Sequence, residues 1–165
     1  MNPFTLHPIT PCRATPASTR RSVVFGLLTA GLCAGLSMPA HAEDIFMKRS
    51  WSHAVGGHDV VAYHTEGAAV TGDDAHTMML YGVSWRFSSA ENMATFAANP
   101  DAYRPQYGGY CAWAMAKGKK ATGDPQVWHI HDDKLYLNVS QGIKRKWLRD
   151  IEGFIARADA AWAAL

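Results

Sequence analysis

Three features are scarce or missing in this sequence: cysteine, acidic residues near the N-terminus, and long apolar runs. Only three cysteines occur in 165 residues, at positions 12, 33 and 111. No Asp or Glu precedes residue 43, and the apolar stretch at 23–36 is shorter than the ~20 residues that cross a bilayer. Motifs of serine hydrolases, phosphate-binding loops and zinc-protease helices are also absent, so the sequence carries no signature of those enzyme classes.

The first 42 residues have the features of a secretory signal peptide. Three arginines and no acidic residue come first, the short apolar run follows, and Ala40-His41-Ala42 provides small residues around a cleavage site. We therefore predict a leader at 1–42, a mature domain at 43–165, export to the periplasm, and no stable membrane anchor after cleavage. The segment 19–24 also resembles a twin-arginine leader, so the general secretory route and the twin-arginine route both stay open.

Removal of this leader would leave residues 43–165, which are enough for a single core and show no evident repeat or linker. The formal net charge would change from +2 to −1, because all 14 acidic residues but only 13 of the 16 Lys and Arg follow residue 42. Nucleic acid is therefore not an expected partner, since phosphate binding requires a basic surface. Cys111 would be the only cysteine left, so an internal disulfide is excluded.

The residue patterns predict one α+β domain, with a small antiparallel sheet or hairpins packed against short helices. Strands are expected at 60–64, 76–80, 84–87, 127–131 and 134–138. Helices are expected from Ser88, where Glu91 completes a capping box, and from Pro100. Segment 110–117 fits a helix or a strand, and the alanines and Gly118 just beyond favour the helix. An amphipathic C-terminal helix is also expected, and its predicted buried face consists of Ile151, Phe154, Ile155, Ala158 and Trp162.

Five segments, in this order, resemble the exported YHS-domain family that is often labelled "(seleno)protein". They are Gly57–Tyr63, Trp85–Asn92, Asn99–Tyr103, Pro105–Ala112 and Leu135–Asn138, so the resemblance spans nearly all of the predicted mature chain. It implies a small metal-binding module, with selenocysteine in some relatives at the position of Cys111. The chain departs from YHS domains proper, because Trp85–Ser88 stands in place of the Tyr-His-Ser type motif and no cysteine lies near it.

Cys111 is the first candidate for chemistry. It follows Gly108-Gly109 and lies between Tyr110 and Trp113. In the first turn of a helix, free amide groups and the helix dipole would favour the reactive thiolate, and the family resemblance also favours a thiol that reacts or binds metal. The alternative is a small apolar residue packed among aromatic rings, which is a common environment for unpaired cysteine.

Histidines are the next candidates. His129 and His131 are two apart in a predicted strand, so both rings would share one face and could chelate copper or zinc. The alternative is a pair of solvent-facing polar residues near a hairpin tip. His58 fits one of the family segments, and its neighbour Asp59 is expected to cap or pair with backbone groups.

Three functions are compatible with the sequence. The first is binding of a metal ion, copper or zinc, or of a small ligand, through Cys111 together with His58, His129 or His131. The second is thiol redox chemistry, in which Cys111 forms a sulfenate or a mixed disulfide with a periplasmic partner protein. The third is a non-catalytic interaction domain with an inert core cysteine, which a sealed sulfur would favour.

Overall fold

The computed structural model of this protein describes residues 46, 48 and 50–165. The predicted signal peptide, its cleavage site, Cys12 and Cys33 lie outside this part of the chain. The described residues form two antiparallel two-stranded sheets and several short helices, which confirms the predicted α+β class. None of the described helices is both long and apolar enough to span a membrane.

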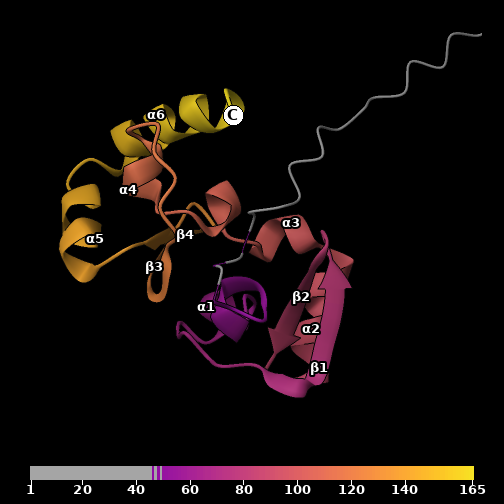
Figure 1. The fold of residues 1–165 in the computed structure, drawn as a ribbon. Helices are drawn as coiled ribbons and strands as arrows, with labels where there is room; N and C mark the ends of the chain where they lie inside the picture. Colours follow the sequence, from indigo (N-terminus) through magenta and orange to yellow (C-terminus); the bar gives the residue numbers. More distant parts are fainter. Residues whose placement is uncertain (1–45, 47, 49) are drawn as a thin grey trace, which may run out of the picture. The chain divides into compact units, whose positions relative to one another are not determined.

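Figure 1 shows the elements in the order of the sequence. They are η1 (Ala54–Gly57), α1 (Ala62–Thr65), β1 (Asp73–Leu80), β2 (Val83–Phe87), α2 (Ala90–Ala98), α3 (Pro100–Tyr103), η2 (Gln106–Gly109), α4 (Ala112–Met115), β3 (Asp124–His131), β4 (Lys134–Asn138), α5 (Gln141–Trp147) and α6 (Ile151–Ala163). β1 pairs with β2 and β3 pairs with β4, so both predicted hairpins are confirmed. The predicted helix start at Pro100 is confirmed as well.

The element order contains an internal repeat. Each unit consists of a left-handed glycine turn, a short helix, a hairpin and a serine-capped helix, and the units occupy 54–98 and 106–147. Residues 55–57 have φ values of 52°, 62° and 76°, and residues 107–109 have values of 55°, 59° and 81°. Such values are uncommon outside glycine. Two consecutive glycines hold the second and third positions of each turn, and Val55 and Tyr107 hold the first. The expectation that the chain has no repeat is therefore wrong.

The two hairpins match residue for residue. The pairs of β1–β2, from Asp73↔Phe87 to Leu80↔Val83, recur 51 residues later in β3–β4 with the same bulge. Gly72 and Gly123 precede the hairpins at equivalent positions. A Cβ atom on Gly72 would lie 2.6 Å from the Cβ of Arg86, and one on Gly123 would overlap the Cβ of Leu137. Both positions therefore require glycine for the same reason, a close approach of the opposite strand.

Two hydrophobic clusters lie on opposite faces of the second hairpin. Leu135 and Leu137 belong to the first cluster, whose other members come mainly from the first repeat, whereas Tyr136 belongs to the second. Trp147 of α5 and Ala158 of α6 are also in the second cluster, at 0% exposure. The β3–β4 hairpin is thus shared by both clusters. The expected buried face of the C-terminal helix is confirmed, because all five of its residues join the second cluster.

Three local predictions are wrong. Segment 60–64 is no strand, and its last three residues belong to α1. The Asp59 carboxylate starts this helix, because it accepts hydrogen bonds from Val61 N at 2.9 Å and Ala62 N at 3.3 Å. Helix α2 begins after Ser89 rather than Ser88, since Ser89 Oγ accepts from the amide of Asn92. The helix expected over 110–117 is only the four residues of α4.

Candidate functional site

Cys111 is a fully buried residue at the N-cap of α4. Its exposure is 0%, and its S–H donates to Asn138 Oδ1 at 3.5 Å. It precedes the first turn of the helix, with φ −59° and ψ 118°, so it does not hold the helical position that the thiolate hypothesis requires. Within residues 50–165, no group of three metal-ligating side chains includes this sulfur. In this structure the thiol is a hydrogen-bonded core group.

Asp59 occupies the position in the first repeat that Cys111 occupies in the second, 52 residues later. Its side chain is 0% exposed and accepts five hydrogen bonds. Two come from the backbone at the start of α1, and three come from the amide and hydroxyl of Ser88 and from Asn92 Nδ2, at 2.7–2.8 Å. The predicted capping role of Asp59 is therefore confirmed. The carboxylate joins α1 to the start of α2.

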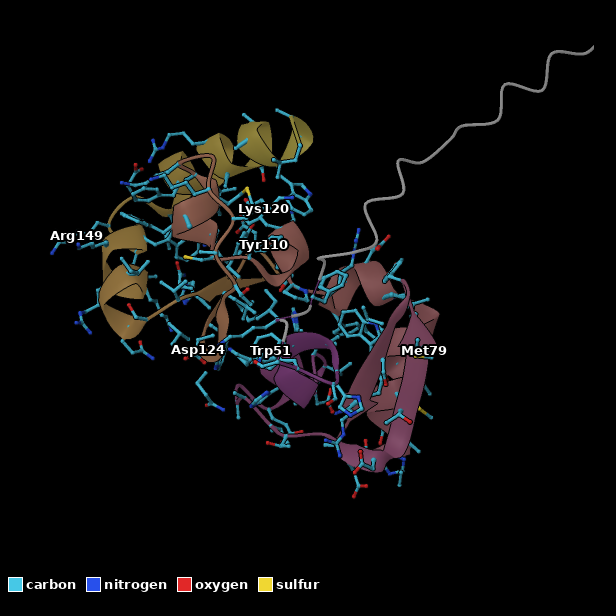
Figure 2. The ribbon with its side chains drawn as sticks, in the orientation of Figure 1. Trp51, Met79, Tyr110, Lys120, Asp124 and Arg149 are labelled. Atoms are coloured by element: carbon cyan, nitrogen blue, oxygen red, sulfur yellow. The ribbon has the colours of Figure 1, made fainter. Side chains whose placement is uncertain are left out.

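His58 lies apart from Cys111 and lines a cavity of about 350 Å³ between the two repeats. Its Nδ1 is 3.1 Å from Val55 O and its Nε2 is 2.9 Å from Gln126 Nε2. Since Val55 O can only accept, Nδ1 carries the proton and Nε2 accepts from the Gln126 amide. Trp51 and Asp124, both labelled in Figure 2, line the same cavity. Both nitrogens of His58 are thus engaged in contacts with the protein.

His129 lies on the face of β3 opposite Trp128 and Ile130, as predicted. Its ring packs against Trp147 with the centroids 5.8 Å apart, while Trp128 and Ile130 pack on the first cluster. Burial lowers the pKa of His129, and the charges of Lys144 and His131 lower it further. A lowered pKa keeps the imidazole neutral near pH 7.

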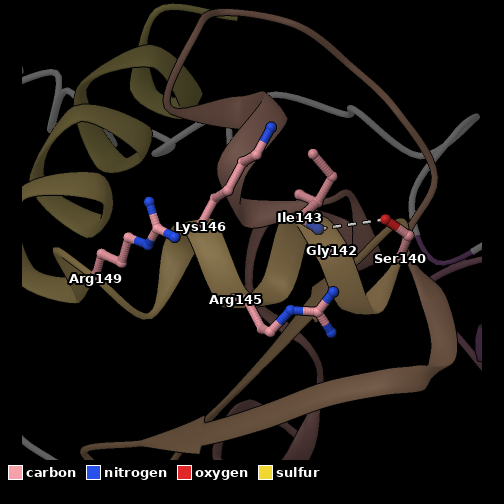
Figure 3. Close-up of a pocket in the computed structure, with 6 residues that line it drawn as sticks. All are labelled: Ser140, Gly142, Ile143, Arg145, Lys146 and Arg149. Carbon is pink, nitrogen blue, oxygen red and sulfur yellow. Dashed lines mark hydrogen bonds between the residues drawn. The ribbon is translucent and has the colours of Figure 1, made fainter.

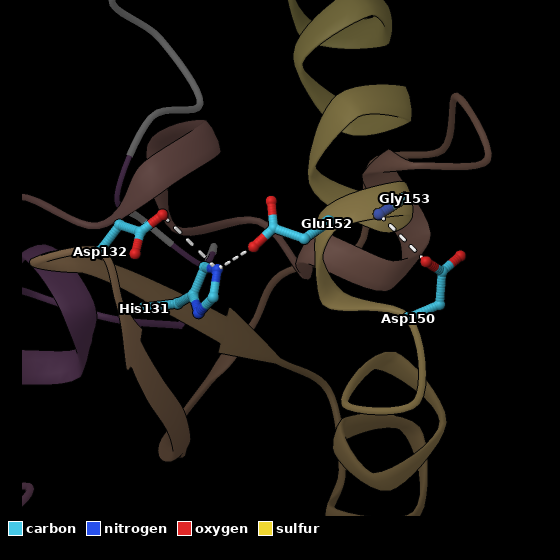
Figure 4. Close-up of polar contacts among 5 residues, drawn as sticks. All are labelled: His131, Asp132, Asp150, Glu152 and Gly153. Atoms are coloured by element: carbon cyan, nitrogen blue, oxygen red, sulfur yellow. Dashed lines mark hydrogen bonds and ion pairs between the residues drawn. The ribbon is translucent and has the colours of Figure 1, made fainter.

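His131 meets two carboxylates at the tip of the second hairpin. Its Nε2 is 2.7 Å from Glu152 Oε1, in the first turn of α6, and 3.7 Å from Asp132 Oδ2, in the hairpin turn. Figure 4 shows both carboxylates directed at this nitrogen from opposite sides. One ligand atom from each of the three residues lies within 4.8 Å of the other two. We call this group the hairpin-tip cluster.

The turn that carries Asp132 has an unusual backbone. Asp132 and Asp133 have φ values of 46° and 56°, so both lie in the left-handed region. The equivalent turn of the first hairpin has Tyr81 and Gly82 at φ 55° and 76°. Two left-handed residues form the hairpin turn whose twist suits the strands, but its second position favours glycine. The second repeat has an aspartate there instead.

A cavity of about 510 Å³ adjoins the hairpin-tip cluster and shares Asp132 with it. Four aspartates line this cavity, against one arginine and one lysine. Arg104 is already paired with Asp101 at 2.8 Å, and Tyr107 donates to Asp159 Oδ1 at 2.8 Å. Burial and that hydrogen bond to Asp159 raise the pKa of Tyr107 strongly. The excess of carboxylates gives the approach to Asp132 a negative potential, which attracts cations.

The structure brings one predicted ligand into a multi-residue cluster and adds two that sequence reasoning missed. His131 belongs to the hairpin-tip cluster, whereas Cys111, His129 and His58 do not. Asp132 follows His131 directly in the sequence, so it could have been considered with it. Glu152 lies 21 residues after His131, and only the placement of α6 beside the hairpin brings its carboxylate close to that histidine.

No protein-family model, no curated protein and no solved structure matches this chain. The resemblance to the exported YHS-domain family therefore stays a prediction.

Proposed function

We propose that this protein binds a divalent metal ion at the hairpin-tip cluster, through His131 Nε2 and carboxylate oxygens of Asp132 and Glu152. The observation that carries the proposal is the convergence of one imidazole nitrogen and two carboxylates from two different elements. Imidazole favours zinc and copper among biological metals, and carboxylates are accepted by both. Zn²⁺ and Cu²⁺ are the ions that this set of ligands favours.

The distances suit such an ion after small side-chain movements. With metal–ligand bonds of ~2.0–2.2 Å, tetrahedral geometry places ligand atoms about 3.3–3.6 Å apart. The two contacts of His131 Nε2, at 2.7 and 3.7 Å, bracket this value. The Asp132 and Glu152 side chains are 81% and 78% exposed, so neither is held by packing and both can adjust. Three protein ligands would leave a fourth position for water or a small ligand.

The buried cysteine argues against the thiol-based alternatives. A thiolate ligand for Cu(I), or a sulfur that exchanges with a partner protein, must be reachable, and Cys111 is 0% exposed with only an amide oxygen as hydrogen-bond partner. Its burial favours the interpretation of Cys111 as an inert core residue. Export to the periplasm stays a prediction from the leader, which lies outside the described residues.

Titration of metal-free protein with Zn²⁺, followed by calorimetry, tests the proposal. We expect one site whose affinity falls in His131→Ala and Glu152→Gln by at least the 10- to 100-fold that changes around a metal ligand typically cause, about the same for each. Cys111→Ala is the discriminating variant, and His76→Ala of β1 is a matched histidine control; both should bind as the unchanged protein does. Loss of binding in Cys111→Ala, with binding retained in Glu152→Gln, would refute the hairpin-tip site.

A further inference from the structure

The exposed side of α5 and the turn after it carry a group of unpaired basic side chains. Arg145 and Lys146 of α5, and Arg149 in the turn, are exposed and line a shallow hollow of about 380 Å³ beside Ser140. No ion pair among the described residues includes any of the three. Asp150, the acidic residue next to Arg149, is paired with Arg157 at 3.1 Å and caps α6 through Gly153 N. The positive charge of this face is therefore not balanced locally. We call these three residues the α5 basic face.

The helix that presents this face is held firmly. Trp147 is 0% exposed, and its ring packs against Tyr136 with the centroids 5.3 Å apart. The hydroxyl of Ser140 accepts from Ile143 N and so fixes the start of the helix. Burial of Trp147 on one side leaves the opposite side of α5 directed at solvent. Arg145 and Lys146 are thus displayed by a fixed helix, and Arg149 follows two residues after its end.

The arrangement of the side chains distinguishes between kinds of anionic partner. Figure 3 shows Arg145, Lys146 and Arg149 pointing in different directions from the helix. They do not converge on one point, so they do not form a cradle for a single small anion. Leu148 lies between Lys146 and Arg149 in the sequence and is 39% exposed, so an apolar side chain is accessible among these charges. Scattered cations around an exposed apolar side chain fit an interface that is both anionic and apolar.

We propose that the α5 basic face docks on the surface of a lipid bilayer that contains anionic lipids. Lys and Arg near such a surface are attracted to the phosphate headgroups, and an apolar side chain between them can enter the boundary of the acyl chains. Attachment of this kind is peripheral and reversible. It lies beyond the proposed metal binding, because none of its residues belongs to the hairpin-tip cluster.

Vesicle sedimentation of the full chain tests this proposal, with vesicles of phosphatidylglycerol mixed with phosphatidylcholine and vesicles of phosphatidylcholine alone. Each basic residue near an anionic surface contributes an attraction that corresponds to about a fivefold change in affinity. We expect the triple variant R145A/K146A/R149A to bind the anionic vesicles about 100-fold more weakly than the unchanged protein. Salt should reduce the binding of the unchanged protein.

A second triple variant, K117A/K119A/K120A, removes the same charge from the loop after α4. Lys117 and Lys120 already lie over the rings of Trp113 and Tyr110, so this loop serves as the matched control. Thermal unfolding of both variants checks that each is folded. An equal loss of binding in both triple variants would overturn the proposal, since it would show an effect of net charge alone. Equal binding to both kinds of vesicle, or binding to heparin but not to anionic vesicles, would overturn it too.

Discussion

Replacement of Asp59 by asparagine should destabilise the fold more than any other isosteric change of a carboxylate in the described residues. Asp59 Oδ1 accepts from two backbone amides at the start of α1, and Oδ2 accepts from three donors on Ser88 and Asn92. An asparagine keeps one oxygen, so its best orientation still turns an NH₂ group towards two buried donors. Hydrogen bonds to a charged group are worth about 1.5–3 kcal/mol each, which gives a loss of about 3–6 kcal/mol.

Such a loss is a large part of the total stability of about 5–15 kcal/mol that is typical for a domain. Urea unfolding followed by tryptophan fluorescence measures it, because Trp85 is 1% exposed in the first cluster. Asp73→Asn is the matched control, since Asp73 Oδ1 accepts one exposed hydrogen bond, from Ala75 N at 2.8 Å. A free-energy change for Asp59→Asn no larger than that of Asp73→Asn would refute the account of Asp59 as the link between α1 and α2.

Three further predictions concern separate parts of the structure. Alkylation of Cys111, measured by mass spectrometry of its peptide, should be negligible in the folded protein and complete in urea; rapid labelling without urea would contradict its burial. Asp133→Gly should raise the midpoint of thermal unfolding, because a left-handed residue other than glycine costs about 1 kcal/mol; a lower midpoint would show that the aspartate side chain stabilises the turn. Burial raises the pKa of Tyr136 to about 12, so the stability that this residue contributes is fully present below the unfolded value near 10 and is lost as the pH rises from 10 to 12. Equilibrium unfolding against pH should show this decrease, and an unchanged stability across that window would contradict the shift.

The hairpins and the C-terminal helix could be predicted from the sequence because their signals are local. Apolar and polar residues alternate in β3, and the buried residues of α6 recur at helical spacing, so each pattern reports its own element. The prediction of a strand over 60–64 was wrong because a side-chain contact overrode the local pattern. The β-branched residues of this segment favour a strand, but the Asp59 carboxylate starts a helical turn, and a side chain that caps two backbone amides outweighs intrinsic propensity.

The internal repeat could not be predicted from the sequence, because the two units have the same residues mainly at positions where the backbone geometry requires them. Gly56-Gly57 matches Gly108-Gly109, and Thr71-Gly72-Asp73 matches Thr122-Gly123-Asp124, while most positions between them differ. The equivalent positions Asp59 and Cys111 carry side chains of different chemistry, a carboxylate and a thiol. The two units therefore share their turn geometry, while most side chains between the turns differ.

The candidate site could be predicted only in part. His131 was identified because its place in a strand sets the direction of its ring, which is a local property. Glu152 depends on how α6 packs against the second hairpin, and no local pattern reports that packing. The burial of Cys111 could not be predicted for the same reason, since the tertiary fold decides whether a single residue is exposed. Its neighbours in the sequence suggested reactivity, whereas its partner in the structure is Asn138.

Anomalous diffraction from crystals grown with Zn²⁺ would show whether the hairpin-tip cluster holds metal, because it locates the ion without reference to affinity. We predict a peak at the hairpin tip, ~2.0–2.2 Å from His131 Nε2 and from one carboxylate oxygen each of Asp132 and Glu152. A peak beside Cys111 or His58, with none at the hairpin tip, would contradict this prediction.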